Sequence, residues 1–172
     1  MTVHSYVDRI FRRLQGLLQI GQISTPPDDT GTVQTGQVTV NGTAVRDGVP
    51  IVQDYGFSAV LPVGTKAIIL NVSGDASNGV VIRSIHQQSR PKGLKNGQVC
   101  LFDAAGDQVL LTNGSGITVT SQSGQPITLN GKTVINGPLE VSDDATIGGI
   151  SFLNHLHGGV QSGSSTTQKP QS

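Results

Sequence analysis

Two histidines near the end of the chain have the clearest potential for chemistry. They stand in the run 154–159, Asn-His-Leu-His-Gly-Gly, which leads into a stretch rich in Gly and Ser. On an extended strand, residues i and i+2 face the same way, so His155 and His157 would point to one side. Imidazole nitrogens suit Fe, Ni, Cu or Zn. Two histidines from one chain nevertheless make a poor metal site, and such a pair in a Gly/Ser-rich tail is often incidental.

The pair becomes a metal site if three copies of the chain meet on a threefold axis. His155 and His157 would then present six nitrogens, which suits an octahedral metal, whereas zinc normally takes four ligands. The chemistry therefore depends on the elements that bring the copies together.

Other side chains offer little that resembles catalysis. Glu140 is the only glutamate, and no carboxylate lies within ten residues of His155. An iron oxygenase site would add a carboxylate to the histidines, and a glycoside hydrolase would need two positioned carboxylates. Cys100 has no His or Asn close in sequence, so we expect a buried or unreactive thiol. We predict that the protein is not an enzyme and has no small-molecule substrate.

Composition narrows the fold class. The 172 residues carry 11 Lys and Arg against 11 Asp and Glu, with 23 Gly, 2 Tyr, 4 Phe and no Trp. A nucleic-acid binder would usually show a basic excess and aromatic stacking platforms, so no nucleic-acid partner is expected. The mixture favours an all-β, turn-dense protein that gains solubility by assembly. The chain shows neither a signal peptide nor a membrane-span pattern, which predicts synthesis in a cytoplasm.

The first segment, residues 1–18, predicts a helix. Its apolar residues recur at intervals of three and four, namely Val3, Tyr6, Val7, Ile10, Phe11, Leu14, Leu17 and Leu18. Arg9, Arg12 and Arg13 lie away from this stripe. A membrane-surface helix would also fit the pattern. We favour a solvated arginine face, with the apolar stripe packing on the protein or on a partner subunit.

Residues 19–90 predict a small barrel. The β-branched runs lie at 38–42, 49–52, 66–72 and 79–85, and Asn-Gly and Asp-Gly turn signals separate them. About five strands with short connections fit an OB-fold. Oligonucleotide binding would need more exposed aromatics and cations than Tyr55, Phe57, Lys66 and a few arginines provide.

Residues 91–152 predict a β-helical shaft. Short runs lie at 98–102, 108–112, 117–120, 127–130, 133–136, 139–142 and 150–152. Turns follow one another at the close spacing of a β-helix or solenoid. Each run offers about two inward aliphatics, and Phe102 and Phe152 are the only aromatics from 98 to 152. Such a segment cannot bury a core alone and would leave edges exposed. We therefore expect three intertwined copies.

Three motifs carry a resemblance to a known family. These are Gln-Asp-Tyr-Gly-Phe at 53–57, Gly-Asp-Ala-Ser-Asn-Gly-Val-Val-Ile at 74–82 and Gly-Gln-Val-Cys-Leu-Phe-Asp-Ala-Ala-Gly at 97–106. They resemble the Mu-type baseplate assembly proteins, the central spikes of contractile phage tails, which are similar to the P2-type tail spike. The ending from His155, with Gly163, Thr166, Thr167 and Pro170, looks like the iron-binding apex of such spikes.

The resemblance implies a structural function. It implies a homotrimeric, membrane-piercing spike of the virion tail baseplate, with an OB-fold collar, a β-helical shaft and an apex over 153–172. One iron ion per trimer would have six histidine ligands, His155 and His157 of each chain. Family members can also carry calcium and chloride, for which no ligands are assigned. Baseplate hub proteins and, transiently, the host outer membrane would be partners.

Two alternatives remain open at the level of sequence. One is the tip of a trimeric receptor- or carbohydrate-binding tail fibre, which would usually place exposed aromatics at its end. The other is the equivalent spike of a contractile bacteriocin or injection system.

Overall fold

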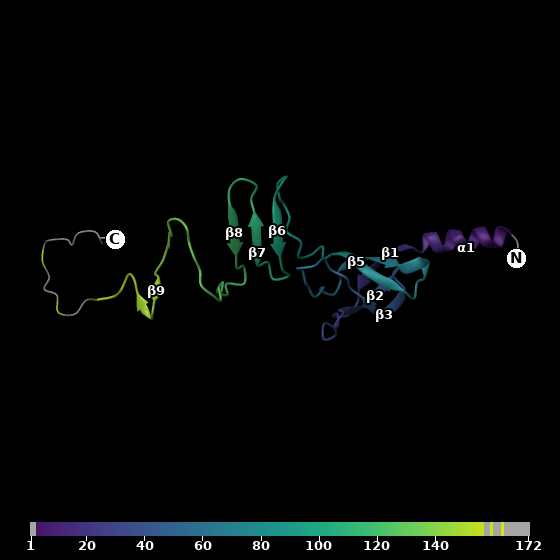
Figure 1. Ribbon diagram of the computed structural model, residues 1–172, viewed down its shortest axis with the longest axis horizontal. Coiled ribbons are helices and arrows are strands. Elements are labelled where there is room, and N and C mark those ends of the chain that lie inside the picture. The colour runs from purple at the N-terminus through teal and green to yellow at the C-terminus, as the bar shows by residue number, and fades with distance from the viewer. Residues whose placement is uncertain (1–2, 157–158, 160–162, 164–172) are drawn as a thin grey trace. The chain divides into compact units, whose positions relative to one another are not determined.

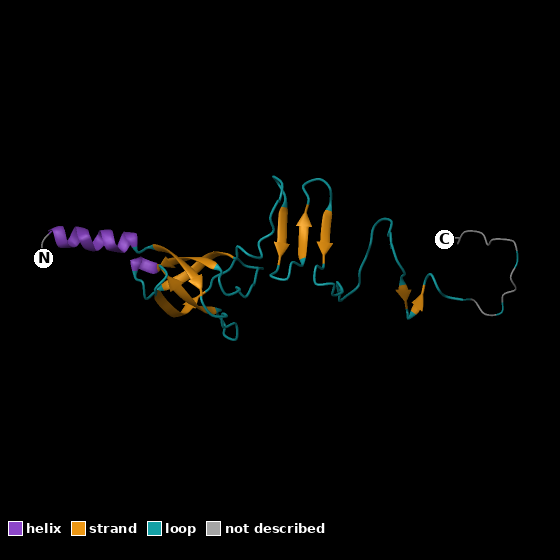
Figure 2. Cartoon of the chain, turned by 180° about the vertical axis from the view of Figure 1, so that it is seen from behind, coloured by secondary structure: helices purple, strands orange, loops and turns teal. Residues whose placement is uncertain are grey.

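The computed structural model describes residues 3–156, 159 and 163. This part of the chain is mostly β, as predicted, with one α-helix, one short 3-10 helix and ten strands (Figures 1 and 2). The elements are α1 (Val3–Gln15), β1 (Leu18–Ile23), β2 (Thr35–Val40), β3 (Ala44–Pro50), β4 (Lys66–Asn71), η1 (Val72–Gly74), β5 (Gly79–Ile85), β6 (Val99–Phe102), β7 (Gln108–Leu111), β8 (Ile117–Thr120), β9 (Thr146–Ile147) and β10 (Ile150–Ser151).

Strands β1 to β5 form one curled antiparallel sheet. Its strand order is β3-β2-β1-β4-β5. Beyond the end of β3, Ile51 forms a parallel bridge with Val81 of β5, and the amide of Val52 donates to the carbonyl of Val81 at 3.0 Å. The two outer strands of the order therefore meet, and the sheet curls around its own apolar side chains.

The inner face of this sheet is a well-packed aliphatic core. Its buried residues are Ile23, Val38, Val40, Val49, Ile51, Ala67, Ile69 and Val81. Alternation places them inside, since β2 and β4 bury every second residue. Gly21 faces the same core, where an added Cβ would lie 2.5 Å from Val38 Cγ1. That position therefore requires glycine.

A polar network joins the end of α1 to the sheet. Asn71 is fully buried. Its side-chain nitrogen donates to the Gly16 carbonyl and to Gln19 Oε1, and its oxygen accepts from Arg46. Arg46 also donates to Gln19 Oε1 at 2.7 Å. Because Asn71 satisfies a carbonyl just beyond the last helical turn, the network fixes where the helix ends.

The helix is shorter than the predicted 1–18. It ends at Gln15, and β1 begins at Leu18, so Leu17 and Leu18 leave the helical stripe. Pairing with β2 and β4 captures this segment, because Leu18 lies opposite Leu70 and Gly21 opposite both Val40 and Ala67. Tertiary pairing thus overrides a local helical pattern.

Strands β6, β7 and β8 form a separate antiparallel sheet in chain order (Figure 1). Their positions confirm the predicted runs at 98–102, 108–112 and 117–120. Asp103 at the β6–β7 turn accepts hydrogen bonds from the amides of Ala105, Gly106 and Asp107 at 2.9–3.0 Å. This carboxylate fixes the turn and with it the register of the two strands.

Three predicted strands are absent from the single chain. The runs 127–130, 133–136 and 139–142 are loop in the described structure (Figure 2). A four-residue strand needs a neighbour for its backbone hydrogen bonds, and the chain places none beside these runs. The prediction of strands there is therefore wrong for the isolated chain.

The chain divides into two compact units, residues 1–127 and 128–172. In the second unit, β9 and β10 pair as a short hairpin, which shortens the predicted strand 150–152 to two residues. The predicted domain limits 1–18, 19–90, 91–152 and 153–172 stay predictions. No helix in the described part of the chain combines the length and apolar character that a bilayer span requires.

Candidate assembly surface and candidate metal apex

One face of the β6–β8 sheet is entirely aliphatic. The register pairs Val99 with Leu111 and Leu101 with Val109 across β6 and β7. It pairs Val109 with Val119 and Leu111 with Ile117 across β7 and β8. Paired residues share a face, so the aliphatic face consists of Val99, Leu101, Val109, Leu111, Ile117 and Val119. The opposite face is mixed, since Cys100, Leu110 and Thr118 lie in one row across it.

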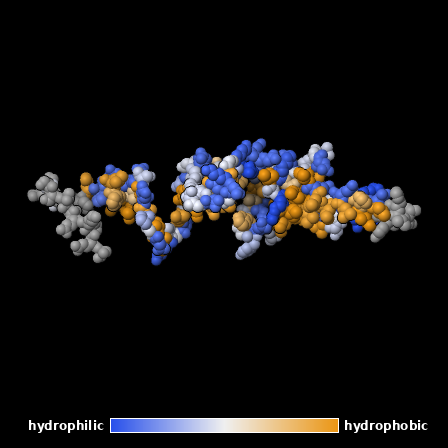
Figure 3. Space-filling view, turned by 90° about the horizontal axis from the view of Figure 1, so that it is seen from above, coloured by the Kyte–Doolittle hydropathy of each residue, from blue (hydrophilic) through white to orange (hydrophobic). Residues whose placement is uncertain are grey.

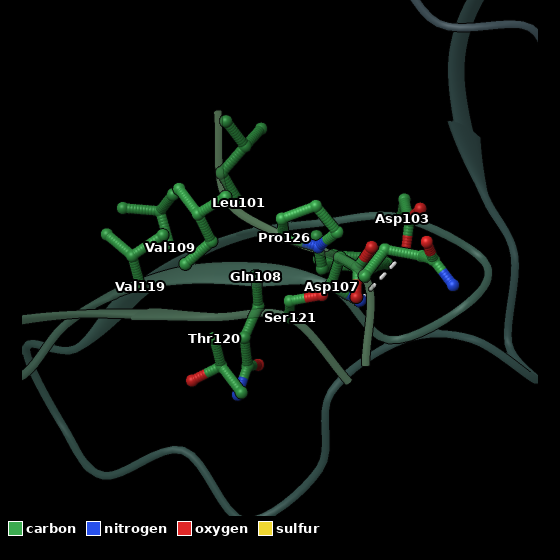
Figure 4. A pocket seen from close by; sticks show the side chains of 12 residues that line it. Leu101, Asp103, Asp107, Gln108, Val109, Val119, Thr120, Ser121 and Pro126 are labelled. Atoms are coloured by element: carbon green, nitrogen blue, oxygen red, sulfur yellow. Dashed lines mark hydrogen bonds between the residues drawn. The ribbon is translucent and has the colours of Figure 1, made fainter. Parts of the chain in front are cut away.

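This aliphatic face is largely uncovered within the chain. Ile117 is 69% exposed and Val99 60% exposed. In Figure 4 the side chains of Leu101, Val109 and Val119 lie together beside a groove of about 360 Å³. Contiguous apolar surface of this kind marks an interaction site. The three strands thus present an apolar face like one side of a hydrophobic core, and the described residues do not supply the opposite side.

Polar side chains frame one end of the face. Asp107 accepts from the Ser123 amide at 3.0 Å and from the Ser123 hydroxyl at 3.1 Å. The Ser123 amide is the main cause that lowers the pKa of Asp107. The carboxylate therefore ties the turn after β8 to the start of β7.

The loop segment after residue 127 continues the apolar pattern. Leu129 is 71% exposed. The other aliphatic side chains of this segment are also exposed, namely Ile127, Val134, Ile135, Leu139 and Val141. Polar Thr, Asn, Glu and Ser residues stand between many of them. This is the pattern of half-buried strands, here without the strands that would bury them.

The N-terminal part of the chain also carries uncovered apolar side chains. On α1 these are Val7, Ile10, Phe11 and Leu14, and on the outer face of the curled sheet Leu18, Ile20 and Ile68 (Figure 3). These described residues of the predicted helical stripe are thus not buried by their own chain. Arg12 and Arg13 are exposed, as expected for a solvated face.

The second unit builds a small hairpin next to the histidine pair. Ile147 lies opposite Ile150, and Gly148 and Gly149 form the two-residue turn between them. Both glycines have positive φ, 59° and 84°, which a tight hairpin turn of this length requires. The chain then passes through Phe152, whose amide donates to the Ala145 carbonyl at 2.8 Å.

Asp144 closes this hairpin at its base. Its carboxylate accepts from the Leu153 amide at 2.9 Å. A hydrogen bond from the Ser151 hydroxyl is the main cause that lowers the pKa of Asp144, followed by the Leu153 amide. The Ser151 oxygen in turn accepts from the Asn154 amide at 2.9 Å and from its side chain at 3.1 Å. These contacts connect the hairpin to the residues directly before His155.

His155 is held by the backbone of the same turn. Its Nδ1 lies 2.8 Å from the Phe152 carbonyl and 3.2 Å from that of Ser151. A carbonyl oxygen can only accept, so Nδ1 carries the proton. In the neutral imidazole the lone pair then belongs to Nε2. Ring contact with Phe152, at 6.2 Å between centroids, further restricts its orientation.

His155 fits the role of a metal ligand, because a ligating histidine commonly donates its other nitrogen to a carbonyl. The second predicted ligand, His157, lies outside the described residues. Within the residues that the structure describes, no group of three or more His, Cys, Asp and Glu side chains gathers to hold a metal.

Sequence reasoning did not single out Asp144 or Ser151. Their roles depend on hydrogen bonds across the hairpin, over seven to nine residues. The signal that could have found them is the Gly-Gly pair at 148–149 between two isoleucines, which is typical of a two-residue hairpin turn. An acceptor side chain just before such a hairpin can reach the amides just after it.

Comparisons with known proteins match two separate parts of the chain and one relative along most of its length. The family model described as Bacteriophage Mu Gp45, N-terminal, matches residues 21–88, and the GpV apex motif matches residues 149–171. Over 163 residues the chain is 30% identical to the Mu-like prophage FluMu protein gp45 of Haemophilus influenzae. That alignment covers 85% of this chain and 88% of the relative.

Proposed function

The chain belongs to the family of Mu-type phage baseplate spike proteins, and from this premise we propose that it is the homotrimeric central spike that pierces the host outer membrane when the tail contracts. Membership in this family supports a structural role in the tail baseplate. The observation that carries the proposal is the uncovered aliphatic face of β6–β8, because three such faces turned inward would form one closed core.

The curled sheet is the proposed OB-fold collar. The strand order β3-β2-β1-β4-β5, with a parallel contact between the outer strands at Ile51 and Val81, supports a closed five-stranded barrel. Its own core makes it a stable base. The collar would extend over 19–90, after an N-terminal segment at 1–18 that contains α1.

Residues 91–152 are the proposed shaft, an intertwined β-helix of three chains. The exposed aliphatics of 127–141 support it, since strands from neighbouring copies would cover them and pair their backbones. A needle must resist bending, and strands paired between chains resist because many hydrogen bonds would have to break together. Charge is sparse along the shaft, with Lys132 its one cation after residue 100.

The apex, residues 153–172, is proposed to bind one iron ion per trimer through His155 and His157 of each chain. The apex motif is a metal-binding motif, which supports a metal at this end. Bound there, the metal would act as a crosslink between three chains. The chain's own contribution is to hold the His155 ring with Nδ1 against a carbonyl. Calcium or chloride could be additional ions, and we assign no ligands to them.

Baseplate hub proteins are the proposed partners of the N-terminal segment. The uncovered stripe of α1, with Phe11 61% and Leu14 62% exposed, offers a surface for such contacts. The proposed location is the virion tail, after synthesis in the host cytoplasm. Contact with the outer membrane would be transient.

Metal analysis of the trimer tests the apex. We expect about one iron per three chains, and loss of iron in the His155→Ala, His157→Ala double variant. The matched control is His86→Ala, which changes a histidine outside the apex that contacts Ser89. Both variants should remain trimeric, because the aliphatic faces are unchanged. Iron at full stoichiometry in the double variant would refute the assignment of ligands.

Labelling of intact particles with an antibody to the chain tests the role in the tail. We expect the label at the baseplate end, inside the ring of fibres, with one trimer per tail. Label on the fibres themselves would contradict a central spike and would favour the receptor-binding fibre instead.

A further inference from the structure

We propose that Asp144 is the positioning residue of the metal apex: it orders the turn after β10 so that His155 presents Nε2 to the metal. This inference rests on the proposed metal site. Asp144 stands eleven residues before His155 in the sequence, and the β9–β10 hairpin brings the two ends together.

The carboxylate of Asp144 contacts the chain after the hairpin. Its Oδ1 accepts from the Leu153 amide at 2.9 Å, two residues before His155. The Ser151 side chain lies in the same turn, and its oxygen accepts from the Asn154 side chain at 3.1 Å. A carboxylate forms stronger hydrogen bonds to amides and hydroxyls than a neutral acceptor does. The turn is thus held by a charged group at its base.

The contacts of Ser151 extend to the residues around His155, the proposed metal ligand. The Ser151 oxygen accepts from the amide of Asn154, the residue directly before His155, at 2.9 Å. The two carbonyls that face His155 Nδ1 belong to Ser151 and Phe152. Both residues directly precede Leu153, whose amide donates to Asp144. The imidazole tautomer and ring direction follow from where these carbonyls lie.

The neighbouring carboxylate provides a natural comparison. Asp143 has the same charge and almost the same place in the sequence, yet the described structure gives its side chain no hydrogen bond of this kind. A general effect of negative charge near the apex would involve both residues equally. A positioning effect would involve Asp144 alone.

Release of iron to a chelator tests the proposal in the full-length trimer. Variant Asp144→Asn keeps the side-chain shape but loses the charge, and Asp143→Asn is the matched control. We expect iron to leave Asp144→Asn about tenfold faster than the unmodified protein, in line with effects of residues behind metal ligands. Asp143→Asn should release iron at the unmodified rate. Equal release rates in all three proteins would overturn the proposal.

A second measurement reads the histidine directly and needs no metal. Nitrogen-15 NMR of His155 in the metal-free trimer should show the proton on Nδ1. In Asp144→Asn we expect a mixture in which the Nε2-protonated form increases several-fold. An unchanged tautomer ratio would contradict the proposed positioning, even if iron release changed.

The two proposals fail in different ways. If the His155→Ala, His157→Ala double variant keeps its iron, the metal site itself is wrong. If the double variant loses iron but Asp144→Asn behaves like Asp143→Asn in both measurements, the metal site stands and the positioning role is wrong. Trimer mass and β signal, measured for every variant, show that the proteins compared are folded.

Discussion

The curled sheet and the segment from 99 to 142 use the same aliphatic residues in opposite ways. In the sheet β1–β5, Ile23, Val38 and Ile69 have no exposed surface at all. In the later segment, Ile117 and Leu129 are about 70% exposed. The first region completes its core within one chain. The second has the alternation of a core strand, but the described part of the chain leaves these side chains exposed.

The difference shows that alternation specifies a strand but not its partner. In the collar, connections return the chain so that β1 lies between β2 and β4, and every core strand finds a neighbour. Beyond β8 the described structure pairs only β9 with β10, and the runs 127–130, 133–136 and 139–142 stay unpaired. Strands in such a segment would need neighbours from other copies, which the proposed intertwined shaft would supply.

Charge on the aliphatic face should abolish assembly. The double variant Val109→Asp, Val119→Asp would place six carboxylates in a closed threefold core, and each buried unpaired charge is strongly unfavourable. We expect a monomer by size-exclusion chromatography with light scattering, with the β1–β5 sheet still folded. Thr118→Asp, on the opposite face of β8, is the control and should stay trimeric. A double variant that remains trimeric would remove this face from the interface.

Truncation of one aliphatic in each region should be similarly costly. Ile69→Ala opens a cavity in the collar and should cost about 2–5 kcal/mol. Leu129→Ala should cost about 2–4 kcal/mol, because partner copies bury this side chain in the assembly. Denaturant unfolding at equal protein concentration measures both. A change within about 0.5 kcal/mol for Leu129→Ala, as for surface substitutions, would mean that the segment stays exposed.

Loss of the buried amide of Asn71 should loosen the junction of helix and collar. Asn71→Ala leaves the Gly16 carbonyl and Arg46 without this partner and should cost about 1–3 kcal/mol. Thermal unfolding should show the loss. Asn78→Ala, an exposed asparagine of the same region, should be nearly neutral. If the two variants melt together, the network contributes little to stability.

Acid should weaken the hydrogen bonds between Asp107 and Ser123 at the end of the aliphatic face of β6–β8. The Ser123 amide lowers the pKa of Asp107 in the folded protein. The charged carboxylate therefore stabilises the fold above about pH 4. This contribution is lost as the pH falls through the lowered pKa of Asp107. We expect the melting temperature to fall between pH 5 and pH 3, and to fall less in Asp107→Asn. Identical pH profiles would show that this hydrogen bond adds nothing measurable.

Local patterns predicted the elements that depend on local sequence. Apolar residues at intervals of three and four predicted the helix. Its end at Gln15 depends on Asn71, which is far away in sequence. The β-branched run at 79–85 coincides with β5, and 117–120 with β8. Strand β1 escaped prediction because Leu17 and Leu18 also continue the helical stripe. Its strand character comes from pairing with β2 and β4.

The candidate site was only partly predictable. His155 and His157 could be singled out because their residue types and spacing are visible in sequence. The support from Asp144 and Ser151 could not, since it depends on a hairpin that brings the two sides together. The runs between 127 and 142 show the opposite case. Their alternation predicts strands, but a single chain offers no neighbouring strand for their backbone hydrogen bonds.

The mass of the unmodified full-length protein in solution tests the central claim most directly. Sedimentation equilibrium should give about 53 kDa, for three chains of 17.8 kDa, across a wide range of concentration. Circular dichroism of the same sample should show a β content above that of the single chain, because 127–142 would gain strands. A stable 17.8 kDa monomer with an intact β signal would contradict the account.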